Sequence, residues 1–153
     1  MDIERKLDDM GLTLPPAAVP LADYVPFVRT GALIFISGQG PLTADGTAIA
    51  GRLGDDLDVE DGARAAQLCA LNVLAHLGTA LDGDWSRIER CVRLGGLVNA
   101  TPDFTHHPAV VNGASSLMVA LMEERGKHAR FAVGVSGLPM NWAVEVEAIF
   151  EVR

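Results

Sequence analysis

The sequence predicts an α+β fold in which one sheet carries two helices on a single face. Strand-like apolar runs occur in pairs near both ends of the chain, and two long segments with helical spacing lie between them. A further β-compatible run separates the two helical segments, so the expected order is β-β-α-β-α-β-β. The second face of the sheet must then meet water, a ligand or another subunit. Because the strands are rich in Val, Leu and Ile, we expect a subunit.

The first residues predict a short helix followed by extended chain. Ile3, Leu7 and Met10 recur at helical spacing over residues 2–10, and Gly11 ends the pattern. Residues 12–22 contain prolines, which remove backbone donors and bias their neighbours toward extended conformations. We therefore treat residues 1–20 as an N-terminal extension and expect one domain over residues 21–153.

The next elements are expected to be a hairpin and a long helix. Strand-like runs over 24–29 and 32–37 are separated by Thr30-Gly31, a joint short enough for a hairpin. The tract 37–56 is rich in Gly and turn-forming residues, with a short strand expected over 47–52. A helix is predicted over 59–81, where apolar residues follow helical spacing and acidic residues favour the N-terminus.

The second half of the chain predicts a strand over 88–98, a helix over 107–125 that stops at Gly126, and strands over 129–136 and 142–152. We expect the segment GLPMN, which joins the last two strands, to form a hairpin. Strand alternation places Phe131, Val133 and Val135 on a face that packs under helices, and Arg130, Ala132 and Gly134 on the other.

The same alternation makes Arg130 and Glu145 a candidate pair. If the last two strands form a hairpin, Arg130 and the glutamates of the last strand share one side of the sheet. Arg130 leads a row of small residues, which leaves space in front of its guanidinium. Two interpretations remain open. The first is a solvated face with ordinary cross-strand ion pairs. In the second, Arg130 binds a carboxylate through its bidentate fork and Glu145 acts on water.

Composition excludes several other classes of function. The formal charge of −8 argues against nucleic acid and anionic membranes as partners. No window approaches the roughly 18 apolar residues of a membrane span, and the N-terminus lacks the apolar core of a signal peptide, so we expect a cytoplasmic protein. Cys69 and Cys91 show no C-x-x-C spacing and are expected as buried thiols. His106-His107 lacks further ligands at useful spacing, so we expect no metal.

Five segments together resemble the RidA/YjgF family. HARFAVGV (128–135) and LPMNWAVEVEAIFEV (138–152) are similar to its C-terminal signature, in which an Ala-Arg pair opens a strand and a Leu-Pro turn precedes a glutamate-bearing strand. TGALIFISGQGPL (30–42) and ADYVPFVRTG (22–31) resemble the family's first two strands. VNGAS (111–115) falls where the family begins a helix near Val-Asn. The resemblance covers about residues 20–153, so residues 21–153 are identified as a RidA-like domain.

This resemblance implies a chorismate-mutase-like subunit, a homotrimer and ligand clefts between subunits. Members of the family hydrolyse reactive enamines and imines, such as 2-aminoacrylate and 2-iminopropionate, to 2-keto acids and ammonia without a cofactor. The family's arginine matches Arg130, and the glutamate associated with water activation matches Glu145. The positions expected to bind substrate are Tyr24, Ser37, Gly38 and Asn112, with Ala132 sharing the cleft side.

Three functions follow as hypotheses. The first is deamination of small imine or enamine acids. Phe131 and Ala132 stand where deaminating members often carry small polar or thiol residues, which motivates a second hypothesis, a protein that binds a small carboxylate without turnover. The third is the endoribonuclease activity of some relatives, which the acidic charge and few aromatic residues disfavour.

Overall fold

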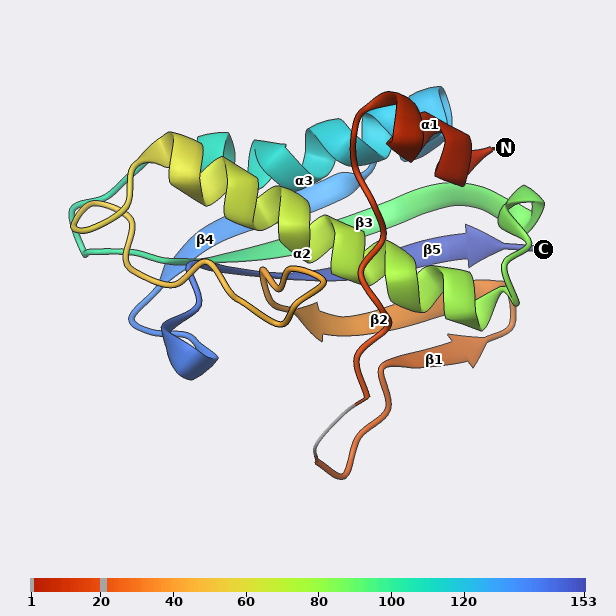
Figure 1. Cartoon of the computed structure of the whole chain (residues 1–153), viewed down its shortest axis with the longest axis horizontal. Helices are drawn as coiled ribbons and strands as arrows, with labels where there is room; N and C mark the ends of the chain where they lie inside the picture. The colour runs from red at the N-terminus through yellow and green to blue at the C-terminus, as the bar shows by residue number, and fades with distance from the viewer. Residues whose placement is uncertain (1, 20–21) are drawn as a thin grey trace.

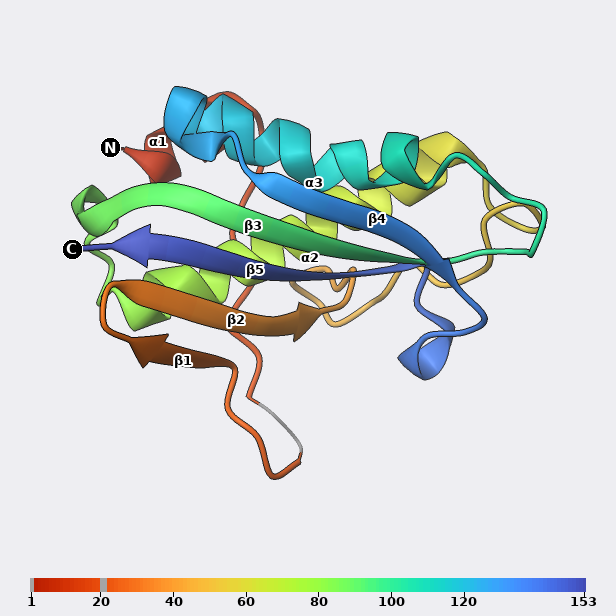
Figure 2. The same cartoon turned by 180° about the vertical axis from the view of Figure 1, so that it is seen from behind.

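The computed structural model describes residues 2–19 and 22–153, which form a sheet with helices on one side (Figure 1). Helices α2 and α3, Val59–Ala80 and His107–Met122, cross the same face of the sheet. The opposite face, here called the open face, carries no helix of the described chain (Figure 2). The predicted α+β fold class is therefore confirmed. The strands are β1 (Phe27–Thr30), β2 (Leu33–Gln39), β3 (Ile88–Asn99), β4 (Ala129–Val135) and β5 (Val144–Val152).

The strand order β1-β2-β5-β3-β4 corrects one prediction. The first two strands form the expected antiparallel hairpin, but the last two strands do not pair, because β3 lies between them. β4 runs parallel to β3, whereas β5 is antiparallel to it. The connection from β4 to β5 passes the end of β3, where Asn99 Nδ2 donates to Asn141 Oδ1 at 3.0 Å. The turn residues of GLPMN therefore belong to a crossover rather than to a hairpin.

The prediction of which β4 side chains face the helices was also wrong. Arg130 lies beside Leu94 in the register, and its guanidinium bonds to α3, so the row that begins with Arg130 faces the helices. A Cβ on Gly134 would come 2.5 Å from the His107 ring, again on the helix side. Phe131 instead lies on the open face beside Gly95 and under the Arg93 guanidinium. Small side chains on β4 allow α3 to approach, and the bulky apolar ones are left facing outward.

The core lies between the sheet and the two long helices. On β5, five side chains facing the helices are at most 2% exposed, namely Val144, Val146, Ala148, Phe150 and Val152. The two helices also pack closely on each other. A Cβ on Gly113 of α3 would come 1.9 Å from the Ala63 carbonyl oxygen of α2, so this contact requires glycine. The two cysteines are buried and free, as expected.

Helix α2 begins where its acidic residues predict. The Asp58 carboxylate accepts from the Asp61 N–H at 2.8 Å, and the Asp61 carboxylate accepts from the Asp58 N–H at 3.2 Å. This reciprocal capping box satisfies two backbone donors that a helix start otherwise leaves free. Residues 47–52, by contrast, form isolated bridges and not the expected strand.

The N-terminal extension packs on the rest of the chain. Helix α1 (Ile3–Asp9) buries Ile3 and Leu7 in the common core, and Lys6 Nζ donates to the Leu121 carbonyl at 2.9 Å. Beyond α1, the chain crosses α2 toward the β1 edge of the sheet (Figure 1). The predicted boundary between residues 20 and 21 lies outside the described residues. Among the described helices, none is long and apolar enough to span a membrane.

Candidate functional site

A pocket of about 380 Å³ lies beside the end of β2 and contains three of the predicted site residues, Tyr24, Gly38 and Glu145. Its walls come from the segment before β1, the Gly38–Gly40 stretch and the crossover before β5. Most of the lining is apolar and includes Val19, Pro26, Leu42, Met140 and Trp142. The polar side chains of the lining are Tyr24, Gln39, His76 and Glu145.

Glu145 is held against the glycine beside it. Glu145 follows the first residue of β5 and points to the open face, opposite Leu97 of β3 in the register. A Cβ on Gly38 would come 2.9 Å from Glu145 Oε1, so only glycine leaves the carboxylate where it is. Burial raises the pKa of Glu145 above its ordinary value. A carboxylate with a raised pKa is better suited to exchange protons with water near neutral pH.

Ser37 fixes the segment that carries Tyr24. The Ser37 hydroxyl donates to the Val25 carbonyl at 2.9 Å, and the Ser37 N–H donates to the Pro26 carbonyl at 2.9 Å. These bonds anchor the chain just before β1, which places Tyr24 at the pocket. The Tyr24 ring itself is largely exposed. Ser37 therefore lies behind the pocket wall and supports it.

Arg130 belongs to a second group of residues, at the edge strand β4. Its Nη1 donates to Asn112 Oδ1 at 2.8 Å and to Ser115 Oγ at 3.1 Å. Asn112 and Ser115 lie one turn apart on the same side of α3, so both reach the guanidinium. Nε and Nη2 donate to no partner in the described part of the chain, which leaves two donor nitrogens of the fork for a ligand. Ala132 follows on the same face of β4 and is partly buried against the core.

A hydrogen-bond chain continues behind Ser115. Its hydroxyl lies 2.9 Å from His128 Nε2, and His128 Nδ1 lies 2.6 Å from the Gly126 carbonyl. A carbonyl can only accept, so Nδ1 carries a hydrogen and donates it to Gly126, and Nε2 can accept from the Ser115 hydroxyl. Ser115 can then accept from Arg130 while it donates to His128. This chain gives the guanidinium a fixed orientation.

Within the chain the two groups lie on opposite faces of the sheet. Arg130, Asn112 and Ala132 are on the helix side of β4, whereas Glu145 is on the open face of β5, with β3 between these strands. The prediction that Arg130 and Glu145 share one side of the sheet is therefore wrong. It assumed that the last two strands form a hairpin. One group can hold an anion and the other can exchange a proton, but a single chain does not bring them together.

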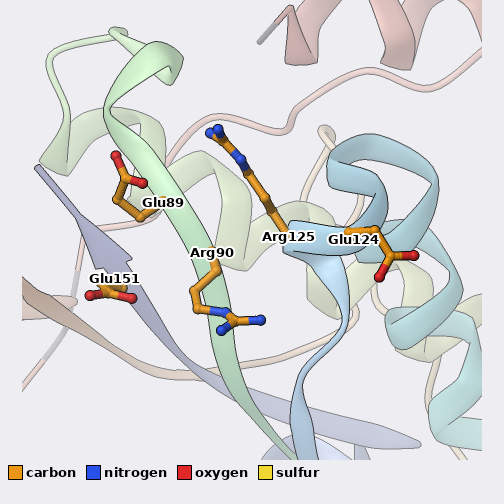
Figure 3. Close-up of a pocket in the computed structure, with 5 residues that line it drawn as sticks. All are labelled: Glu89, Arg90, Glu124, Arg125 and Glu151. Carbon is orange, nitrogen blue, oxygen red and sulfur yellow. The ribbon is translucent and has the colours of Figure 1, made fainter.

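A second hollow, of about 300 Å³, has a different character (Figure 3). It is lined by charged residues of both signs, Glu89, Arg90, Glu124, Arg125 and Glu151. Figure 3 shows the Arg90 and Arg125 guanidinium groups pointing in different directions, and Arg125 Nη1 donates to the Ile88 carbonyl at 3.2 Å. These side chains do not converge on a common point, so we do not place the site here.

Ser115, Trp142 and His76 are among the residues of the two groups that were not predicted from the sequence. Ser115 could have been found, because it lies three residues after Asn112 on one helix face. Trp142 was assigned to the last strand and actually lies before it, with its ring against Gly40. His76 sits among the apolar residues of α2, and no local pattern distinguishes it from a core residue.

The fold and site define a class: an α+β chain in which one sheet face carries no helix of the described residues, with an arginine on an edge strand and a glutamate on the central strand. Comparison with known proteins identifies this class. Residues 4–152 match the family model described as "YjgF/chorismate mutase-like, putative endoribonuclease". The chain therefore belongs to the YjgF family, and the resemblance to RidA/YjgF proteins is confirmed.

Individual relatives are similar to this protein over almost the whole chain. Protein TCP17 of Trypanosoma cruzi is 43% identical over 152 residues, which cover 99% of this chain and 94% of the relative. Protein Atu1372 of Agrobacterium tumefaciens is 45% identical with a TM-score of 0.92, covering 99% of this chain and 94% of that one. A protein of Shewanella oneidensis described as a putative endoribonuclease is 34% identical with a TM-score of 0.93, covering 98% and 99%. The similarity to these proteins includes the N-terminal extension.

Proposed function

We propose that the protein hydrolyses reactive imines and enamines of the 2-iminopropionate and 2-aminoacrylate type to 2-keto acids and ammonia. The observation that carries the proposal is the arrangement of Arg130. Its guanidinium is fixed by Asn112 and Ser115, yet Nε and Nη2 have no partner in the described chain. A fixed fork with two free donors is suited to a carboxylate, which every substrate of this type carries. The net charge of −8 disfavours extended polyanions as partners, whereas a single cationic group can still hold a small anion.

The complete site would form between subunits of a homotrimer. The open face exposes Val28, Phe35 and Val133 by 41–54%, and apolar side chains of this size favour burial against another subunit. If the β4 edge of one subunit lies against the open face of the next, Arg130 of the first subunit comes near a neighbouring Glu145 pocket. The trimer thereby supplies what one subunit lacks. Light scattering after size-exclusion chromatography measures the molecular mass of the protein in solution and so tests for the trimer.

The chemistry needs few groups because an imine carbon is already electrophilic. Arg130 holds the substrate carboxylate, and Glu145 accepts a proton from water as the water oxygen bonds to the imine carbon. Glu145 returns this proton to the nitrogen, which gives a carbinolamine. It then takes the proton of the new hydroxyl group and passes it to the amine as the C–N bond breaks, so that ammonia leaves and the C=O of a 2-keto acid forms. An enamine enters the same sequence after a proton moves from its nitrogen to its terminal carbon to give the imine. Tyr24, Gly38 and Asn112 shape or support the cleft, with Ser37 behind its wall. The reaction as written consumes one water and is balanced without a redox partner.

The test generates 2-aminoacrylate with a dehydratase and follows keto-acid and ammonia release. We expect the wild type to accelerate release, Arg130→Ala to raise the substrate concentration for half-maximal rate at least tenfold, and Glu145→Gln to lower the maximal rate by about 10²–10⁴. Arg64→Ala is the matched control, because Arg64 lies exposed on α2 and pairs with Asp61. The proposed activity is wrong if the wild type does not raise the rate above that measured without protein. It is also wrong if Arg130→Ala hydrolyses 2-aminoacrylate as fast as the wild type.

One observation favours a second candidate, a binding protein without turnover. Ala132, the next residue along the Arg130 face of β4, carries no group that could donate or accept a proton, so β4 supplies Arg130 for binding but no acid or base beside it. Stabilisation of the wild type by pyruvate that is lost in Arg130→Ala, together with no acceleration of 2-aminoacrylate hydrolysis, would identify this function. RNA cleavage is less well supported, because the charge is −8 and Arg90 and Arg125 are interspersed with glutamates.

A further inference from the structure

His76 is a buried polar side chain that the proposed reaction does not use. It projects from α2 into the lining of the 380 Å³ pocket and is only 2% exposed. No hydrogen bond of the described chain involves its ring, although its helical neighbour one turn earlier, Asn72, donates to the Leu42 carbonyl at 2.8 Å. Buried polar groups are normally hydrogen-bonded, so this imidazole can offer its donor and its acceptor to a ligand that enters the pocket.

The pocket reaches from Glu145 to His76 around the edge of the sheet. Glu145 lies on the open face of β5, whereas His76 comes from a helix on the opposite face. β1 pairs with β2 only as far as Phe27 opposite Ile36, so no strand of the described residues lies on the outer side of the Gly38–Gly40 stretch. The pocket passes over this uncovered stretch. A three-carbon acid held near Glu145 would therefore leave the His76 end empty.

The wall between the two polar ends suits an apolar group of the size of a ring. The Trp142 ring lies against Gly40, where a Cβ would come 2.6 Å from it, and Pro26 and Leu42 complete this part of the lining. Ala18 and Val19, from the chain that crosses α2 (Figure 1), line it as well. A volume of 380 Å³ lies within the range of pockets that enclose small organic ligands.

We propose that this pocket selects 2-imino or 2-keto acids whose apolar, ring-sized side chain ends in a hydroxyl group, and that His76 binds that hydroxyl. The inference rests on the proposed function for the acid end of the ligand, where Arg130 and Glu145 act. Burial lowers the pKa of His76, so the ring is neutral near pH 7 and offers one donor and one acceptor. A hydroxyl can use either of them, whereas an unsubstituted ring leaves the imidazole without a partner.

Calorimetric titration with two stable keto acids tests this. We expect 4-hydroxyphenylpyruvate to bind the wild type about tenfold more tightly than phenylpyruvate, the effect of one buried hydrogen bond. His76→Leu should bind phenylpyruvate and lose the preference, whereas His76→Gln, which retains a donor and an acceptor, should keep part of it. His106→Leu is the control, because His106 lies in the loop before α3 and outside this pocket.

Two outcomes overturn the inference: a wild type that binds both compounds equally or neither, and a preference that survives in His76→Leu. The wild-type comparison needs no variant, so it remains decisive even if His76→Leu does not fold. No turnover is measured here. Failure of the deaminase proposal is read separately, from 2-aminoacrylate hydrolysis by the wild type.

Discussion

The Arg130 group and the Glu145 pocket are built by opposite means. Around Arg130, polar side chains from α3 and the loop before β4 form a continuous hydrogen-bond chain. Around Glu145, the neighbours are glycine backbone and apolar side chains, with no hydrogen bond to the carboxylate in the described chain. The first group fixes the orientation of the Arg130 guanidinium, whereas the second partly desolvates the Glu145 carboxylate.

This difference matches two separate tasks. A guanidinium that holds a carboxylate needs orientation and remains charged throughout, so hydrogen bonds from behind are sufficient. A carboxylate that takes and returns a proton needs the two protonation states to be close in free energy, and desolvation brings them closer. Perturbing the two regions should therefore give different kinetic signatures.

Among the changes that leave both Arg130 and Glu145 in place, the largest effect is expected from Gly38→Ala. The added Cβ would come 2.9 Å from Glu145 Oε1 and must displace the carboxylate, which is the mobile end of the side chain. We expect the maximal rate of 2-aminoacrylate hydrolysis to fall ten- to a hundredfold, because displacements of about 1 Å cost rates of this order. The free energy of unfolding should change by less than about 1 kcal/mol, since a flexible side chain absorbs the clash.

Gly137→Ala is the matched control for this change. Gly137 lies in the crossover after β4, where a Cβ would meet no atom within 4 Å. Both variants should show similar urea unfolding midpoints, and only Gly38→Ala should lose rate. Equal rates in the two variants would mean that the position of the Glu145 carboxylate does not govern the reaction.

A smaller effect is expected from Ser115→Ala, which acts on the other region. The substitution removes one acceptor from Arg130 Nη1 and interrupts the chain to His128, while the bond to Asn112 remains. The guanidinium loses orientation but keeps its charge, so we expect the KM to rise about three- to tenfold with kcat within twofold.

Ser116→Ala provides the comparison for Ser115→Ala. Ser116 is the next residue on α3 and is exposed, and it takes no part in the hydrogen bonds of the Arg130 group. A merely structural role for Ser115 would lower stability without separating KM from kcat. A fall in kcat at constant KM would contradict the assignment of Arg130 to binding.

The sequence predicted the elements well because their signals are local. The spacing of apolar residues located α2, and Asp58 with Asp61 marked its first turn. Strand alternation correctly placed Glu145 opposite the core-facing residues of β5, because burial along that strand alternates strictly. Local patterns of this kind depend only on residues a few positions apart.

The relation between the two regions was mispredicted because it is not local. Nothing in the segment from Ser136 to Ala143 indicates that β3, about 40 residues earlier, separates β4 from β5. On β4 both faces carry small or apolar residues, so the alternation of Arg130 with Phe131 did not reveal which side faces α3. His76 was not predicted as a site residue for a related reason, because its place in the pocket depends on segments far away in the sequence.

The smallest effect concerns stability and comes from the desolvated carboxylate. Because burial raises the pKa of Glu145 in the folded state, the folded protein binds this proton more tightly than the unfolded chain. Stability then falls as pH rises from about the ordinary value for glutamate through the raised one. Glu145→Gln removes this loss. We expect the variant to gain free energy of unfolding relative to the wild type between pH 4 and pH 7, measured by urea unfolding at fixed protein concentration. If instead the wild type becomes more stable relative to the variant as the pH rises over this range, a favourable partner, and not desolvation, governs the pKa of this carboxylate. The contrast with the Arg130 region would then disappear.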